Sequence, residues 1–222
     1  MPALDPVTAA KLINLLGALL LLSVFFMLAA RQVYAAISAY AVQSVLLAVV
    51  AVVVGYTTGL ADLYLVAVFT LASKAILITL FLRYIARRAE SWRELALYIN
   101  VPVSLVVGGV LTILAYFSTF SIPIHGGLNT KPSLSIAVSI MLVGLFLMIS
   151  RAEVIMQIVG LVTLENGLFL GALTVSYGTP LIVEFGIFFD VLIGVSVMGI
   201  LVLRIREGAS TTSTTDLRRL RG

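Results

Sequence analysis

The sequence predicts an all-α membrane protein, a bundle of seven transmembrane helices. Three observations lead to this prediction. Hydrophobic residues make up 61% of the 222 residues and charged residues only 11%, too few to cover the surface of a soluble domain. Apolar stretches of about 20 residues, the helical length that crosses ~30 Å of hydrocarbon, recur along the chain. Charged residues and turn formers gather between these stretches.

The composition also excludes several kinds of site. The chain has no cysteine and a single histidine, His125, so it lacks the ligands of an iron–sulfur cluster, a haem pair or a zinc site. We therefore expect no cofactor, no metal and no catalytic centre in this chain. The net charge of +4 does not indicate nucleic-acid binding, because the basic residues flank apolar segments, where they orient a membrane protein. His125, in a glycine-rich loop, is expected to be an ordinary surface residue.

The first part of the chain predicts three spans, at residues 12–30, 33–56 and 61–82. Residues 1–10 contain no basic residue and the apolar run that follows is longer than the h-region of a typical signal peptide, so we expect a retained helix rather than a cleaved signal peptide. The third span carries Lys74 in its interior. Residues 83–94 then hold four arginines and two glutamates, which predicts an amphipathic segment at the membrane surface.

The second part of the chain predicts four more spans, at residues 95–124, 133–150, 154–175 and 181–203. The fourth has no charged side chain, and a loop rich in glycine and proline follows it. Glu165 lies near the centre of the sixth span. Glu184 and Asp190 lie in the seventh. The C-terminal tail, rich in serine and threonine, has too little apolar content to order itself.

The basic residues divide unequally between the two faces that seven spans create. One face has only Lys11 and Lys131. The other face collects eleven arginines, namely Arg31, Arg83, Arg87, Arg88, Arg93, Arg151, Arg204, Arg206, Arg218, Arg219 and Arg221. By the positive-inside rule we expect the C-terminus to be cytoplasmic and the N-terminus to be outside.

The first three and the last three spans share a weak similarity. VFFMLAARQVY at residues 24–34 parallels LFLMISRAEVI at residues 145–155, and a short gap then aligns Gln43 near Glu165. Two interpretations stay open: two parallel three-helix repeats joined by a single helix, or chance agreement between apolar segments.

The predicted units are residues 1–94 with the cytoplasmic arginine loop, 95–124 as the linking helix, 125–207 as the second three-helix unit, and 208–222 as a flexible cytoplasmic tail.

Five polar residues inside the predicted spans are the candidate site: Glu165, Asp190, Lys74, Glu184 and Gln43. An ionised carboxylate at mid-membrane costs roughly 2.5 to 3.5 kcal/mol on insertion scales, so Glu165 is a candidate proton-relay group. The alternative is a carboxyl group held by Asn or Thr as interhelical glue.

The other four candidates carry their own alternatives. Asp190 lies on a stripe with Gly186 and Gly194, which leaves room for a neighbouring helix or water. Glu184 lies nearer the outer face and is a candidate exit group. Lys74 either pairs with a carboxylate or snorkels to the interface. Gln43 is more typical of interhelical glue than of a relay group.

Four segments of the sequence resemble hydrogenase-4 component E, a membrane subunit of complex I-like group 4 nickel–iron hydrogenases and formate hydrogenlyase-type complexes. They are AVQSVLLA, LASKAILI, IMQIVGLVTLENGLFLGAL and PLIVEFGIFFDVLIGVSVMGI. The last three spans also resemble the K subunit of respiratory complex I and the C subunit of multisubunit sodium/proton antiporters. Glu165 matches the first carboxylate of that pattern. Asp190 matches the second, where complex I usually has glutamate, and Lys74 and Glu184 match the hydrogenase family alone.

The resemblance implies a membrane-arm subunit of an ion-translocating oxidoreductase in a prokaryotic inner membrane. It implies antiporter-like membrane subunits and a hydrogenase-type redox module as partners, and it places the iron–sulfur clusters and the nickel–iron site in those partners. Two other interpretations stay open. One is an independent transporter of a small solute or cation, and the other is a purely structural scaffold subunit in the lipid bilayer.

Overall fold

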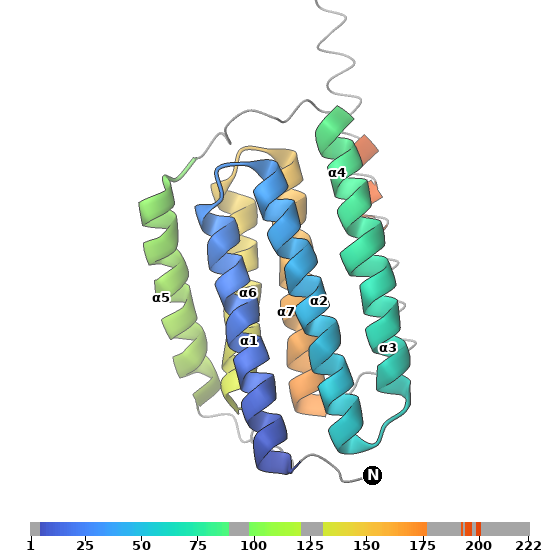
Figure 1. The fold of residues 1–222 in the computed structure, drawn as a ribbon. Helices are drawn as coiled ribbons and strands as arrows, with labels where there is room; N and C mark the ends of the chain where they lie inside the picture. Colours follow the sequence, from blue (N-terminus) through green and yellow to red (C-terminus); the bar gives the residue numbers. More distant parts are fainter. Residues whose placement is uncertain are drawn as a thin grey trace, which may run out of the picture.

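The computed structural model describes residues 5–88, 98–120 and 131–176, together with residues 192, 194–196 and 199–200. The regular elements within these ranges are helices (Figure 1). Their bounds are α1 (Pro6–Ala29), α2 (Val33–Thr58), α3 (Asp62–Thr70), η1 (Leu71–Ile78), α4 (Thr79–Arg88), α5 (Val101–Phe120), α6 (Lys131–Ser150) and α7 (Val154–Ser176). The π-helix η1 joins α3 and α4 into one continuous rod, Asp62–Arg88.

Six of the described helical segments are long and apolar enough to cross a membrane. They correspond to the first six predicted spans, so the chain is a multi-pass membrane protein. The seventh predicted span, residues 181–203, lies almost entirely outside the described residues and stays a prediction. Glu184 and Asp190 are among the residues that are not described.

The third span is longer than predicted. The predicted surface segment at residues 83–94 continues the helix of the third span through Arg88, and its remaining residues lie outside the described part of the chain. Ile85 and Ala86 are buried in this last part, whereas Arg87 and Arg88 are exposed. The helix therefore keeps one apolar face against the bundle after its outer face has become charged.

The fourth span begins later than predicted. Residues 98–100 are not helical, and α5 starts at Val101. The side chain of Asn100 accepts a hydrogen bond from the backbone N–H of Val103 at 3.1 Å, which is the bond an N-cap residue makes. Pro102 follows in the first helical turn, where its missing N–H costs nothing.

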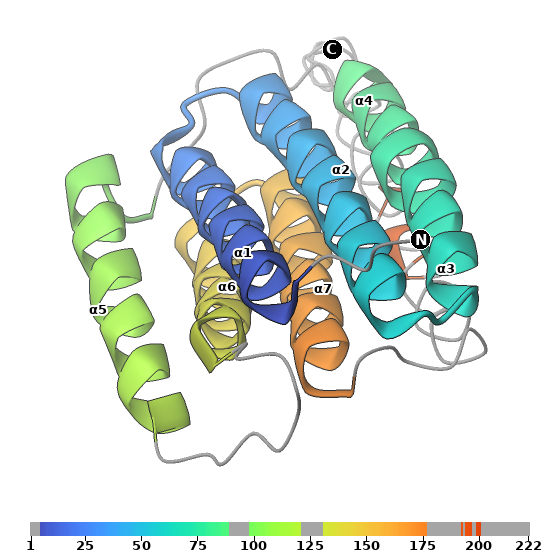
Figure 2. The same ribbon diagram turned by 60° about the horizontal axis from the view of Figure 1, so that its bottom comes forward.

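The bundle is built around α1, α2, α6 and α7 (Figures 1 and 2). Helices α1 and α6 run in the same direction, and α2 and α7 both run back. Helix α5 lies outside α1 and α6, and the Asp62–Arg88 rod lies beside α2. One end of the bundle carries Arg31, Arg83, Arg87, Arg88 and Arg151, and we call it the arginine end.

The closest helix pair is α6 and α7, and glycines allow it. A Cβ atom on Gly160 would lie 2.8 Å from the carbonyl oxygen of Gly144, and one on Gly144 would lie 2.8 Å from the backbone nitrogen of Leu164. A Cβ atom on Gly167 of α7 would lie 2.9 Å from the backbone nitrogen of Met141 on α6. Small residues bring helix backbones together in membranes, so α7 is tightly held next to Glu165.

Candidate functional site

The centre of the bundle holds a buried ion pair between Lys74 and Glu165. The Lys74 Nζ lies 2.8 Å from the Glu165 Oε1. Lys74 is 1% exposed and Glu165 is 3% exposed. Each is near the middle of its helix: Lys74 is the thirteenth residue of the 27 in Asp62–Arg88, and Glu165 is the twelfth of the 23 in α7. The lysine therefore points into the bundle rather than toward an interface.

Lys74 lies in the π-helix η1, the part of its span with the least common backbone geometry. π-Helical segments are rare and are often found at functional sites. The Thr79 hydroxyl donates a hydrogen bond to the carbonyl oxygen of Lys74 at 3.1 Å, which links the two ends of one π-turn. Because a π-turn closes over five residues rather than four, it changes the direction in which the following side chains project.

Phe169 forms the second contact to the lysine ammonium. The Lys74 Nζ lies 4.8 Å from the centroid of the Phe169 ring. Phe169 is one helical turn after Glu165 on α7, so the carboxylate and the ring lie on the same side of that helix. A cation over a desolvated aromatic face gains up to about 2 kcal/mol, and the ring therefore helps to hold the ammonium group beside Glu165.

The second oxygen of Glu165 is a further polar atom inside the bundle. Oε2 is buried and has no hydrogen-bond partner among the described residues. Tyr40, on α2, is fully buried and close enough to interact electrostatically with Glu165. Buried polar atoms of this kind are normally satisfied by protein or by ordered water.

A hydrogen-bond network ties the next residue of α7 to α2. The side-chain amide of Asn166 donates to Gln43 Oε1 at 3.1 Å and to the Ser44 hydroxyl at 3.4 Å. The amide of Gln43 in turn donates to the carbonyl oxygen of Leu20 on α1 at 3.5 Å. The network joins three helices at the depth of the ion pair and fixes the rotation of α7.

The structure brings together three of the five predicted site residues. Lys74 and Glu165 form the ion pair, and Gln43 belongs to the adjoining amide network. The predicted residues Glu184 and Asp190 lie outside the described residues. Within the described ranges there is no group of three or more histidine, aspartate or glutamate side chains that could hold a metal ion.

Sequence reasoning missed Tyr40, Ser44 and Phe169 as parts of the site. Tyr40 and Ser44 are one helical turn apart on the side of α2 that carries Gln43. This spacing of polar groups in an otherwise apolar span was a usable signal. Phe169 had no such signal, because an aromatic residue in a membrane helix is usually part of the packing.

Arg151 differs from the other arginines of the arginine end because it is 0% exposed. Its Nη2 donates a hydrogen bond to the carbonyl oxygen of Leu28, at the C-terminus of α1. Cations are favoured at that end of a helix dipole. Burial lowers the pKa of the guanidinium from its ordinary value, because desolvation disfavours the charged form. Sequence reasoning placed Arg151 at a helix boundary and did not predict that it is buried.

Comparison with known proteins identifies relatives over nearly the whole chain. No family model matches it, and no solved structure matches it. A Mycobacterium tuberculosis protein described as uncharacterised is 30% identical over 197 residues, which cover 86% of this chain and 87% of that protein. Hydrogenase-4 component E of Escherichia coli K12 is 26% identical over 217 residues, which cover 97% of this chain and 100% of that protein. The Shigella flexneri protein of the same name matches equally well. The chain is therefore similar to hydrogenase-4 component E over nearly its whole length.

Proposed function

We propose that this chain is a membrane-arm subunit of a complex I-like hydrogenase or related ion-translocating oxidoreductase, and that Lys74 and Glu165 form one station of its proton path. The observation that carries the proposal is the ion pair at mid-membrane, with 2.8 Å between Nζ and Oε1. Ionisable residues at that depth are expensive and are typical of ion pathways. The family relationship supports a hydrogenase-type complex as the setting.

The pair can rearrange a proton without changing its net charge. Transfer of one proton from the Lys74 Nζ to the Glu165 Oε1 converts ammonium and carboxylate into amine and carboxylic acid. Both states are neutral overall, and this keeps the cost of a buried charge low. The Oε2 of Glu165, which has no hydrogen-bond partner among the described residues, is then the atom through which the pair exchanges a proton with the rest of the path.

The rest of the path is proposed from the sequence. Asp190 and Glu184 are its expected continuation in the seventh span, and Gln43 orients α7 beside them. The antiporter-like subunits and the hydrogenase-type redox module remain the proposed partners. Iron–sulfur clusters and a nickel–iron site belong to that redox module, and no step through them is assigned to this chain.

The orientation and the repeat also belong to this proposal. We place the arginine end on the cytoplasmic side of a prokaryotic inner membrane, with the N-terminus outside and the C-terminus in the cytoplasm, because basic residues concentrate there. The parallel course of α1 with α6, and of α2 with α7, supports two three-helix units joined by α5 (Figure 1). In that arrangement the ion pair connects the first unit to the second.

A purely structural role is the rival, and the amide network favours it. The bond from Asn166 to Gln43 is a typical interhelical contact of membrane proteins. Under this alternative, the ion pair only fastens the Asp62–Arg88 rod to α7. Its loss would then affect assembly of the complex and nothing else.

The deciding experiment measures proton movement per redox turnover in the assembled complex, in inverted membrane vesicles. Glu165→Gln keeps the size of the side chain but cannot ionise, so in the complexes that assemble we expect redox turnover with strongly reduced proton movement. Ser139→Ala is the matched control, because Ser139 is buried and its hydroxyl donates within its own helix, to the Ser135 carbonyl at 2.7 Å. Undiminished proton movement in assembled Glu165→Gln complexes would refute the proposal.

A further inference from the structure

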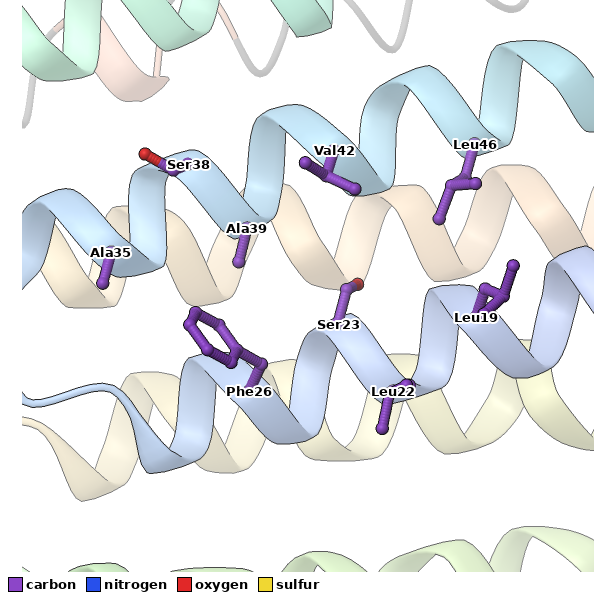
Figure 3. A pocket seen from close by; sticks show the side chains of 9 residues that line it. All are labelled: Leu19, Leu22, Ser23, Phe26, Ala35, Ser38, Ala39, Val42 and Leu46. Atoms are coloured by element: carbon purple, nitrogen blue, oxygen red, sulfur yellow. The ribbon is translucent and has the colours of Figure 1, made fainter.

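The outer face of the bundle carries an apolar groove between α1 and α2, with a volume of about 560 Å³. Figure 3 shows its walls, which are lined by Leu19, Leu22, Ser23, Phe26, Ala35, Ser38, Ala39, Val42 and Leu46. The two serine hydroxyls donate to carbonyl oxygens of their own helices, at 2.6 Å and 2.8 Å, and the Ser38 hydroxyl also accepts a hydrogen bond from Arg83 Nη2 at 3.2 Å. The groove therefore presents hydrocarbon to its surroundings, and its volume is within the range of ligand-binding sites.

The groove has the depth of one membrane leaflet. On α2 it extends from Ala35 to Leu46, which corresponds to about 17 Å at the α-helical rise. This is close to half of the ~30 Å of hydrocarbon in a bilayer. Ala35 lies in the first turn of α2, so the groove starts at the arginine end and stops near mid-membrane.

The end of the groove is positively charged. Arg31 is exposed in the connection between α1 and α2, only four residues before Ala35. The N-terminus of α2, at Val33, is not capped by a side chain, and its dipole favours an anion there. The negative end of the α1 dipole lies at the same place, but the buried Arg151 offsets it by binding the Leu28 carbonyl.

We propose that this groove binds one acyl chain of an anionic phospholipid, with the phosphate at Arg31 and the first turn of α2. The alternative occupant is a transmembrane helix of a partner subunit, for which Ala35 and Ala39 would be suitable small residues. An apolar helix makes no use of the positive charge at the end of the groove, whereas a phosphate does. The lipid assignment requires only that the helices cross a membrane, so it is independent of the proton path.

The test is native mass spectrometry of the full-length chain in mild detergent, titrated with phosphatidylglycerol or phosphatidylethanolamine of identical acyl chains. We expect phosphatidylglycerol to bind about fivefold more tightly, the effect of one arginine at an anionic surface. Arg31→Gln should abolish this preference. Lys131→Gln removes an exposed cation from the opposite end of the bundle and should leave the preference unchanged.

A second pair of variants tests the acyl-chain site. Val42 and Val110 are 56% and 51% exposed, so each accepts a tryptophan without disturbing the core. Val42→Trp blocks the groove and should weaken binding of both lipids at least tenfold. Val110→Trp, on α5, should have no effect.

Three results would overturn the proposal. The first is equal affinity of the unmodified chain for the two lipids. The second is unaltered lipid binding by Val42→Trp. The third is displacement of a partner subunit from the purified complex by Val42→Trp, because a partner helix would then occupy the groove. Proton movement is not an outcome of these experiments, so a failed proton-path test leaves them unaffected.

Discussion

Removal of one charge from the Lys74–Glu165 pair should destabilise the bundle far more than removal of both. Both groups are at most 3% exposed, and the distance between Nζ and Oε1 is 2.8 Å. A single replacement, Lys74→Met or Glu165→Gln, leaves the partner charge buried and uncompensated, which costs about 3–5 kcal/mol. The double variant, Lys74→Met with Glu165→Gln, buries no charge. It keeps only the side-chain amide of the introduced glutamine without good hydrogen bonds, and this lowers the free energy of unfolding by about 1–3 kcal/mol.

The measurement is a double-mutant cycle on the free energy of unfolding, followed by circular dichroism while the full-length chain is titrated with SDS in mixed micelles. With single costs of about 3 kcal/mol or more and a smaller cost for the double variant, the coupling energy is about 3 kcal/mol or more. Ser139→Ala combined with each single variant is the control and should be additive to within about 0.5 kcal/mol. A coupling energy below about 0.5 kcal/mol between Lys74 and Glu165 would refute the ion pair as a stabilising contact.

Three further predictions concern the surroundings of the pair. Phe169→Leu should lower the free energy of unfolding by about 0.5–2 kcal/mol more than the packing loss alone when Lys74 is present. In the Lys74→Met background this extra loss should be smaller, and the same SDS titration measures both. Asn166→Ala should cost about 1 kcal/mol, because it removes the donor to Gln43. Gly160→Ala should cost about 1–3 kcal/mol through overpacking. Gly109→Ala, where an added Cβ meets nothing within 4 Å, should be close to neutral. Equal effects of the two glycine variants would contradict the close approach of α6 and α7.

The spans could be predicted from the sequence because hydropathy and helix length are local properties. The third span shows where that reasoning fails. A hydropathy pattern ends at Arg83, but a helix ends only where its backbone bonds or its packed face end. Ile85 and Ala86 continue the packed face for another turn. At α5 the opposite holds, because the cap at Asn100 starts the helix later than hydropathy indicated.

The members of the site could be predicted in part, but their pairing could not. Lys74 and Glu165 each stand out as ionisable residues in apolar spans. Which helices are neighbours is a property of the tertiary structure, and a single sequence contains little information on it. The π-helix at Leu71–Ile78 also has no sequence signature, since the whole Asp62–Arg88 rod contains neither glycine nor proline.

The ion pair has a consequence for assembly because its two members come from different halves of the chain. Lys74 belongs to the third span and Glu165 to the sixth. Until the two halves meet, each carries a charge that costs roughly 2.5 to 3.5 kcal/mol at mid-membrane. Formation of the pair replaces two such costs by one neutral contact. The interaction therefore favours association of the two halves over either half alone, and it does so at the position proposed to carry the proton.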